Sequence, residues 1–177
     1  KITGGEPFLR PDIFELLAYV KSNNLGLIVE TNATLIKEKE AKALKEANVS
    51  QVAVSLDGPD EETHRALRGI KDSFTEAIEG IGYLKKQGLN VQVIISLWRK
   101  NRDYIKSTID LSRGLGANSV KINIIQNISR ADKLSEEREV LSVKEVIDFY
   151  KHLMSQLEKE PPFKVIFDMP PVFYPLI

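Results

Sequence analysis

The chain opens with Lys1-Ile2-Thr3-Gly4-Gly5-Glu6-Pro7, a stretch that changes character within a few residues. Its first part favours a strand, whereas the two glycines let the backbone turn and approach a ligand closely. Glu6 follows at the mouth of this loop, and Pro7 fixes the direction in which the chain leaves it. The stretch predicts the carboxyl end of a strand that offers carbonyl oxygens and one carboxylate to a cation, most naturally an ammonium group. An ordinary turn with a surface glutamate is the alternative.

Five further strands are predicted from short apolar stretches, at residues 27–31, 51–56, 91–97, 119–125 and 163–167. Patterns with apolar residues at helical spacing separate them, at residues 12–20, 37–47, 60–67, 73–88, 103–115 and 143–158. Strict alternation of strand and helix predicts parallel strands joined by right-handed crossovers. The fold class is therefore α/β. Periodicity leaves two architectures open, an open doubly wound sheet or part of a (β/α) barrel.

Composition narrows the class of protein further. A chain of 177 residues fits one domain with a substantial core. Its 25 basic and 25 acidic residues are interspersed, so no basic field favours nucleic acid as a partner. The apolar runs are too short for a membrane span and nothing resembles a signal peptide, so we expect a cytoplasmic protein. Cysteine is absent, which leaves this chain without a thiolate metal site.

Small polar groups follow the predicted strands at their carboxyl ends. They are Gly4-Gly5-Glu6, Thr31-Asn32, Ser55 with Asp57, Arg99 with Asn101, and Gln126-Asn127. Because the carboxyl ends of parallel strands meet at one edge, these groups predict one ligand contacted by several strands. Turn chemistry alone is the alternative for Thr31-Asn32 and for Asp57-Gly58-Pro59. A buried hydroxyl at Ser55 would need a hydrogen-bond partner.

The other polar residues of this region can be explained by roles in the structure or by exposure at the surface. Asn101 is predicted to cap the helix that follows it. His64 lies in a short polar segment and is interpreted as a solvated surface residue. Arg65 and Arg68 either present a guanidinium to an anion or are surface charge.

Taken in order, these segments resemble the radical S-adenosylmethionine enzymes. The motifs that carry the resemblance are Gly4-Gly5-Glu6-Pro7, Thr31-Asn32, Val54-Ser55-Leu56-Asp57-Gly58-Pro59, His64 followed by Leu67-Arg68-Gly69, and Gly88 before a strand that runs out to Asn101. The chain is most similar to the subgroup with a carboxyl-terminal SPASM or twitch auxiliary iron-sulfur domain. The resemblance covers residues 2–134.

The resemblance implies a partial (β/α)6 barrel and an oxidoreductase activity. In this family a Cys-x3-Cys-x2-Cys loop holds a [4Fe-4S] cluster, and S-adenosylmethionine is reductively cleaved to a 5'-deoxyadenosyl radical that abstracts hydrogen. The substrate would be a small molecule or a peptide, and a reductant such as ferredoxin or flavodoxin would supply the electron.

The resemblance also assigns residues to the cofactor. It places the methionyl ammonium at Gly4, Gly5 and Glu6. It places the carboxylate or the ribose at Thr31 and Ser55, with Asn32 in the same site. Asp57 and Arg99 would make weaker contacts.

This chain departs from the family pattern at three places. The cysteine loop is missing, Ala33 stands where glycine is usual, and Ser129-Arg130-Ala131 stands where many members have Gly-Arg-Ala. We expect the cysteines upstream of Lys1 and an auxiliary domain beyond Ile177, so that residues 1–177 form a core truncated at both ends and inactive alone. The missing first strand would leave a sheet edge open to self-association.

Two other hypotheses remain open. One is a non-catalytic α/β module that binds an amino acid or a nucleotide. The other is an unrelated doubly wound protein with phosphate-binding loops, which is disfavoured because no glycine-rich fingerprint opens any helix.

Overall fold

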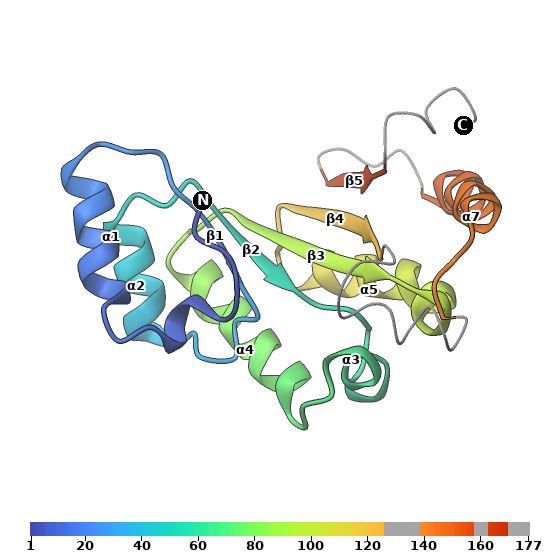
Figure 1. Ribbon diagram of the computed structural model, residues 1–177, viewed down its shortest axis with the longest axis horizontal. Helices are drawn as coiled ribbons and strands as arrows, with labels where there is room; N and C mark the ends of the chain where they lie inside the picture. The colour runs from blue at the N-terminus through green and yellow to red at the C-terminus, as the bar shows by residue number, and fades with distance from the viewer. Residues whose placement is uncertain (126–138, 158–162, 170–177) are drawn as a thin grey trace.

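The computed structural model describes residues 1–125, 139–157 and 163–169. The predicted polar groups Gln126-Asn127 and Ser129-Arg130-Ala131 lie outside these ranges. A five-stranded parallel sheet runs through the described part of the chain (Figure 1). Its strands are β1 (Ile28–Thr31), β2 (Gln51–Ser55), β3 (Val91–Leu97), β4 (Ser119–Ile124) and β5 (Lys164–Asp168).

Neighbouring strands follow one another in sequence, in the order β1-β2-β3-β4-β5. A doubly wound sheet reverses its order at a switch point, whereas the strands of a (β/α) barrel keep their sequence order. The fold is therefore a partial (β/α) barrel. Ile2 extends the sheet beyond β1, because its N–H donates to the Ile28 carbonyl oxygen and its own carbonyl oxygen accepts from Glu30 N–H, both at 2.9 Å. The strand predicted at the start of the chain is reduced to this one-residue parallel bridge.

Helices cover the outer face of the sheet (Figure 1). The helices of this layer are α1 (Ile13–Ser22), α2 (Glu38–Glu46), α4 (Ser73–Lys86), α5 (Ile105–Gly114) and α7 (Val143–Gln156). The short helix α3 (Glu61–Arg68) follows the carboxyl end of β2, and the 3-10 helices η1 (Pro7–Leu9) and η2 (Arg99–Tyr104) follow the start of the chain and β3. Within the described ranges, no helix is long and apolar enough to cross a membrane.

The two faces of the strands differ in chemistry. Val93 and Ile95 of β3 are fully buried and share one apolar core with residues of the outer helices such as Ile81. Because successive side chains point to opposite faces of a strand, the residues between them face the concave side. On that side the register places Ser96 beside Asn123, and Asn123 beside Asp168 of β5. The concave side is therefore polar, as expected of a barrel interior that holds a ligand.

The turn after β1 packs directly on α4. Ala33 in this turn adopts φ 61°, a left-handed conformation that glycine takes without strain. A side-chain carbon added at Gly80 of α4 would overlap the Ala33 carbonyl oxygen and lie 2.9 Å from the Ala33 Cβ. The close approach of α4 to this turn therefore depends on the glycine at position 80.

Gly80→Ala should destabilise the protein by about 1–3 kcal/mol, because the new methyl group meets backbone that cannot move without shifting the turn. The matched control is Gly82→Ala on the same helix, where a side-chain carbon would meet nothing within 4 Å. This control should stabilise the protein by about 0.5–1 kcal/mol through helix propensity. Urea unfolding of both variants checks the prediction, and equal effects at the two positions would contradict the described packing.

Candidate functional site

A cavity of about 460 Å³ opens at the carboxyl edge of the sheet. It is lined by Thr3, Gly4, Gly5, Glu6, Glu30, Asn32, Ser55, Arg68, Ile94, Ser96 and Asn123. These residues come from the loop after Ile2 and from the ends of four successive strands, together with α3. The structure thus brings five of the eight predicted cofactor residues, Gly4, Gly5, Glu6, Asn32 and Ser55, to one cavity.

Glu6 joins the glycine loop to the end of β1. Its Oε1 accepts from the Thr31 hydroxyl at 2.7 Å and from Phe8 N–H at 3.2 Å, and its Oε2 accepts from Asn32 N–H at 2.7 Å. A carboxylate offers about four acceptor sites, so these three bonds leave room for one further donor. Gly4 adopts φ 128°, which only glycine takes readily. The carboxylate and the neighbouring carbonyl groups form an acceptor-rich end of the cavity.

Thr31 and Asn32 are both engaged in turn chemistry. The Thr31 hydroxyl accepts from Ala33 N–H at 3.0 Å while it donates to Glu6. The Asn32 side-chain oxygen accepts from Thr34 N–H at 2.9 Å and from the Thr34 hydroxyl at 2.8 Å. The turn interpretation of these residues is confirmed. Thr31 is 4% exposed and its hydroxyl proton is already used, so its role toward a ligand stays a prediction.

Some polar groups in the cavity lack hydrogen-bond partners within the described residues, among them groups of Ser55 and Asn123. Within residues 1–125, 139–157 and 163–169, the Ser55 hydroxyl makes no hydrogen bond, and Oδ1 of Asn123 is buried without one. A polar group that protein does not satisfy is available to a ligand. Ser55 was predicted on this ground, whereas Asn123 lies inside an apolar strand pattern that gave no signal.

Asp57 does not line the cavity, because its side chain is fully buried. Its Oδ2 accepts from Nε of Arg68 at 2.5 Å, and its Oδ1 accepts from Ser96 N–H at 2.6 Å. Its backbone N–H donates to Nδ1 of His64 at 3.1 Å, and its carbonyl oxygen accepts from Nδ2 of Asn101 at 2.9 Å. A direct contact between Asp57 and the cofactor stays a prediction that this geometry does not favour.

Two structural interpretations were wrong. His64 is not a solvated residue: it is 2% exposed, it packs against the Phe74 ring, and burial lowers its pKa. Asn101 does not cap α5. It is fully buried, accepts from Trp98 N–H at 3.0 Å and donates to the carbonyl oxygens of Asp57 and Ser96. Both residues stabilise the loop at Asp57. These contacts join residues that are separated in the sequence, so the local pattern did not indicate them.

Arg68 and Glu30 are cavity residues that the sequence did not single out for the cofactor. Arg68 carries a guanidinium from the last turn of α3, and Asp57 binds only its Nε. Glu30 accepts from the Thr3 hydroxyl at 2.6 Å and pairs with the Lys1 ammonium. Burial opposes ionisation of Glu30, but the bonds from Lys1 and Thr3 outweigh it and lower the pKa.

Arg99 lies away from the cavity. Its guanidinium binds Glu145 of α7, with the second nitrogen 2.9 Å from Oε2. The residues beside it line a larger hollow of about 560 Å³ between η2, α5 and α7. Ion pairs within that region, such as Lys106 with Asp110, already satisfy most of its charges. The cavity at the carboxyl edge, with its unpaired groups, is the better candidate for a ligand site.

Comparison with known proteins defines the family. The model of the radical SAM superfamily matches residues 1–112, and the chain belongs to this superfamily. It is 34% identical over 135 residues to the AdoMet-dependent heme synthase of Nitratidesulfovibrio vulgaris, covering 76% of this chain and 37% of that protein. It is 29% identical over 160 residues to AlbA of Bacillus subtilis, a subtilosin biosynthesis protein, covering 89% of this chain and 36% of AlbA.

Solved structures show the same fold. SuiB of Streptococcus suis bound to S-adenosylmethionine superposes with a TM-score of 0.82 at 17% identity, over 98% of this chain and 40% of SuiB. The enzyme anSMEcpe with bound AdoMet and a peptide superposes with a TM-score of 0.70 at 21% identity, over 86% of this chain and 45% of that protein. The resemblance read from the motifs is therefore confirmed. This chain spans little more than a third of the two sequence relatives.

The ion pair between Arg99 and Glu145 predicts a low pKa for the Glu145 carboxyl group. The Arg99 guanidinium and the capping bonds from Ser142 lower the pKa of Glu145 from 4.5 to about 2. In Arg99→Met the pKa should rise toward its ordinary value, as followed by carbon NMR of the side-chain carboxyl group. The matched control is Arg113→Met on α5, which should leave it unchanged. A Glu145 pKa near 4.5 in the wild type would contradict the pairing of Arg99 with α7.

Proposed function

We propose that this chain is the core of an iron-sulfur oxidoreductase that reductively cleaves S-adenosylmethionine and abstracts hydrogen from a substrate. The observation that carries the proposal is the cavity at the carboxyl edge, in a chain of the radical SAM superfamily. One end of that cavity is rich in acceptors, and Arg68 and the unpaired Ser55 hydroxyl offer donors elsewhere in it.

S-adenosylmethionine fits the chemistry of these residues. Its methionyl ammonium is a donor and suits the carbonyl groups of Gly4 and Gly5 with the free acceptor site of Glu6. Its carboxylate and ribose hydroxyl groups suit donors such as Ser55. The neutral but polar Asn123 can accept one further hydrogen bond at the wall of the cavity.

The cluster has no ligands in this chain, because thiolates hold such clusters and the sequence contains no cysteine. When bound in the complete enzyme, the cluster and S-adenosylmethionine together supply a 5'-deoxyadenosyl radical for hydrogen abstraction. The cysteines are proposed to precede Lys1, and an auxiliary domain to follow Ile177. The role of residues 1–177 is to bind and orient the methionyl and ribose parts of the cofactor.

Substrate and partners are proposed from the relatives. AlbA is named for bacteriocin biosynthesis, SuiB was solved with its precursor peptide SuiA, and other relatives are named for heme synthesis. The substrate of this protein is accordingly a small molecule or a peptide, and the electron comes from a reductant such as ferredoxin or flavodoxin. The open edge of the sheet remains a candidate surface for self-association.

The full-length protein, reconstituted without oxygen and reduced with dithionite, should release 5'-deoxyadenosine. Ser55→Ala should raise the KM for S-adenosylmethionine by about 5- to 150-fold, the effect of one lost hydrogen bond in a buried site. Ser107→Ala, on the exposed side of α5, is the control and should change nothing. Residues 1–177 alone should neither retain iron nor release the product.

Two results would overturn the proposal. A full-length protein that carries its cluster but releases no 5'-deoxyadenosine above background would favour the non-catalytic binding module. Equal KM values for Ser55→Ala and Ser107→Ala would remove Ser55 from the site while leaving the reaction itself intact.

A further inference from the structure

The concave side of the sheet carries a second charged group beside the cofactor cavity, formed by Lys121 of β4 and Asp168 of β5. On the basis of the proposed function, we infer that Lys121 binds a carboxylate of the substrate, and that Asp168 is the counter-ion that this carboxylate displaces. The substrate is then a compound with at least one carboxylate, held next to the cavity that receives S-adenosylmethionine.

The strand register places Lys121 next to the cavity. One row of paired residues crosses β2, β3, β4 and β5 and consists of Ser55, Ile94, Lys121 and Ile166. Residues paired in this way point to the same face of a sheet, and so does the residue two positions further along a strand. Ser55 and Ile94 line the cavity, as does Asn123 further along β4. Lys121 therefore lies on the concave face, beside Ile94 and roughly 7 Å along β4 from Asn123.

Asp168 faces Lys121 on the same side of the sheet. The preceding residue, Phe167, packs against the rings of Phe149 and Tyr150 of α7 on the outer side. Asp168 therefore points to the concave side, where its Oδ2 lies 2.6 Å from Nζ of Lys121. The Lys121 side chain is 30% exposed and that of Asp168 is 55% exposed. Because an exposed ion pair contributes little to stability, a ligand can replace Asp168 at small cost.

The Lys121 ammonium has donors left for a ligand. An ammonium group carries three N–H donors, and a single bond to Asp168 uses one of them. Within residues 1–125, 139–157 and 163–169, Lys121 makes no other hydrogen bond or ion pair. The lysine lies on the inner strand β4 and is the less exposed partner, whereas Asp168 lies on β5 at the end of the sheet. The cation is thus the member of the pair that a ligand in the concave side would meet.

Glu30 of β1 approaches Lys121 across the concave side but does not bind it. Burial opposes ionisation of Glu30, while Lys1, Thr3 and the positive charge of Lys121 lower its pKa. The influence of Lys121 across two intervening strands shows that the sheet curls around this space. Lys1 and the Thr3 hydroxyl already bind the two oxygens of Glu30. Glu30 therefore has its partners without Lys121, which stays available to a ligand.

The rest of this face favours an anion. At its amino end Nε2 of Gln51 donates to Oε1 of Gln92 at 3.0 Å, and Nε2 of Gln92 donates to the Ser119 hydroxyl at 3.1 Å. These neutral groups satisfy one another. Lys164, the register partner of Ser119, is exposed and adds a positive charge to the same face. Because the two ion pairs described above are neutral as pairs, Lys164 gives the charged strand residues of this face a positive balance.

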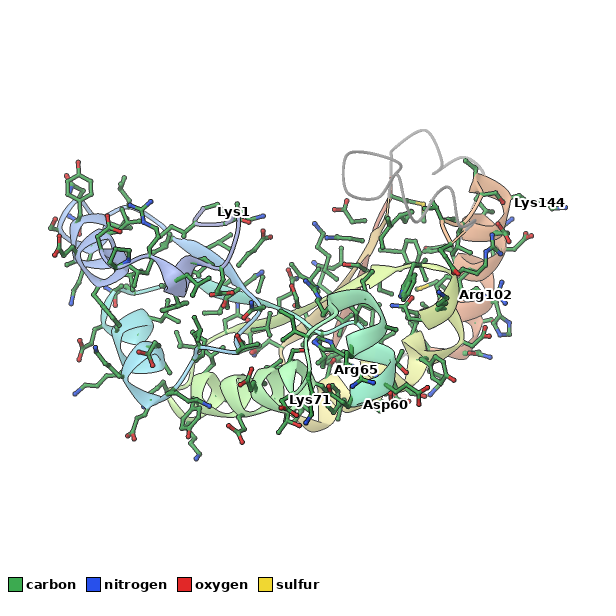
Figure 2. The ribbon with its side chains drawn as sticks, turned by 60° about the horizontal axis from the view of Figure 1, so that its bottom comes forward. Lys1, Asp60, Arg65, Lys71, Arg102 and Lys144 are labelled. Carbon is green, nitrogen blue, oxygen red and sulfur yellow. The ribbon has the colours of Figure 1, made fainter. Side chains whose placement is uncertain are left out.

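The outer layer provides a matched control pair. Lys106 and Asp110 of α5 form an ion pair of 2.8 Å, with side chains 46% and 47% exposed. Figure 2 shows Arg102, which lines the outer hollow together with Lys106, among the helices well apart from the amino terminus. Lys106→Met and Asp110→Asn therefore repeat the charge changes of Lys121→Met and Asp168→Asn away from the concave side. Lys121→Arg keeps the positive charge and is the conservative variant.

The test measures binding by equilibrium dialysis to the full-length protein with its cluster reconstituted. Saturating S-adenosyl-L-homocysteine keeps the probes out of the cofactor cavity. The small-molecule probes are coproporphyrin III, with a carboxylate on each pyrrole ring, and its tetramethyl ester, with none. The peptide probes are acetyl-Gly-Glu-Gly-amide and its counterpart with glutamine in place of glutamate. The pair in which the wild type prefers the carboxylate identifies the source of that group.

The two members of the ion pair should act in opposite directions. Lys121→Met should raise the Kd of the preferred carboxylate probe by about 10- to 100-fold, as expected for a lost hydrogen bond between charged groups. Asp168→Asn should lower that Kd by about 2- to 5-fold, because the ligand no longer displaces a counter-ion. In Lys121→Met the further change Asp168→Asn should bring no gain. Lys121→Arg, Lys106→Met and Asp110→Asn should stay close to the wild type, and the neutral probes should not respond to any variant.

Release of 5'-deoxyadenosine, measured on the same preparation, separates the carboxylate site from the proposed function. A wild type that releases the product but prefers neither carboxylate probe would overturn the role of Lys121 and leave the proposed function standing. Equal Kd values for Lys121→Met and Lys106→Met, or weaker binding in Asp168→Asn, would also overturn it. Selective binding without any product would overturn the proposed function, and with it the role of the bound compound as a substrate.

Discussion

The carboxylate of Asp57 is a charge inside the protein, and the carboxyl edge of the sheet is arranged around it. A buried charge that is not paired and hydrogen-bonded costs several kcal/mol. This cost is a large part of the net stability of a domain. Asp57 avoids this cost with bonds to Arg68 and Ser96, while its backbone binds His64 and Asn101. Its loop therefore cannot move without leaving a charge unpaired.

The sequential order of parallel strands gives that edge its function. Because every strand runs in the same direction, all the loops that leave the strands at their carboxyl ends face one rim. The outer face is packed with apolar residues against the helices, so the polar residues of each strand can only lie on the concave side. Glu6 closes the other end of the rim by joining the glycine loop to Thr31 and Asn32. Two buried or half-buried carboxylates thus fix the two walls of one cavity.

The fold could be predicted from the sequence as far as local pattern reaches. Apolar strands alternate with amphipathic helices, and each of the five strands in the structure lies within two residues of its predicted bounds. The choice between a barrel and a doubly wound sheet depends on which strands are neighbours, and this information is non-local. Only the ordered motifs, through their resemblance to a family, indicated the barrel.

The site shows the same division between local and distant information. Gly4, Glu6 and Ser55 were predictable because each lies at or just beyond the carboxyl end of a predicted strand and has chemistry suited to a ligand. His64 was misread because its neighbours Glu62 and Arg65 are polar, whereas its burial depends on Asp57 and on Phe74 of the next helix. Asn101 resembled a helix cap, but its amide instead satisfies carbonyl groups from two other segments.

Hydrogen exchange of the full-length protein, with and without S-adenosyl-L-homocysteine, tests most directly the claim that the carboxyl edge holds the cofactor. We expect the ligand to slow exchange at residues 4–6, 31–34 and 55–58, which lie on or beside the cavity. Residues 48–51 and 88–91 at the amino edge should exchange at the same rate in both states. Protection confined to the amino edge, or to the outer hollow between α5 and α7, would contradict the assignment of the cavity as the cofactor site.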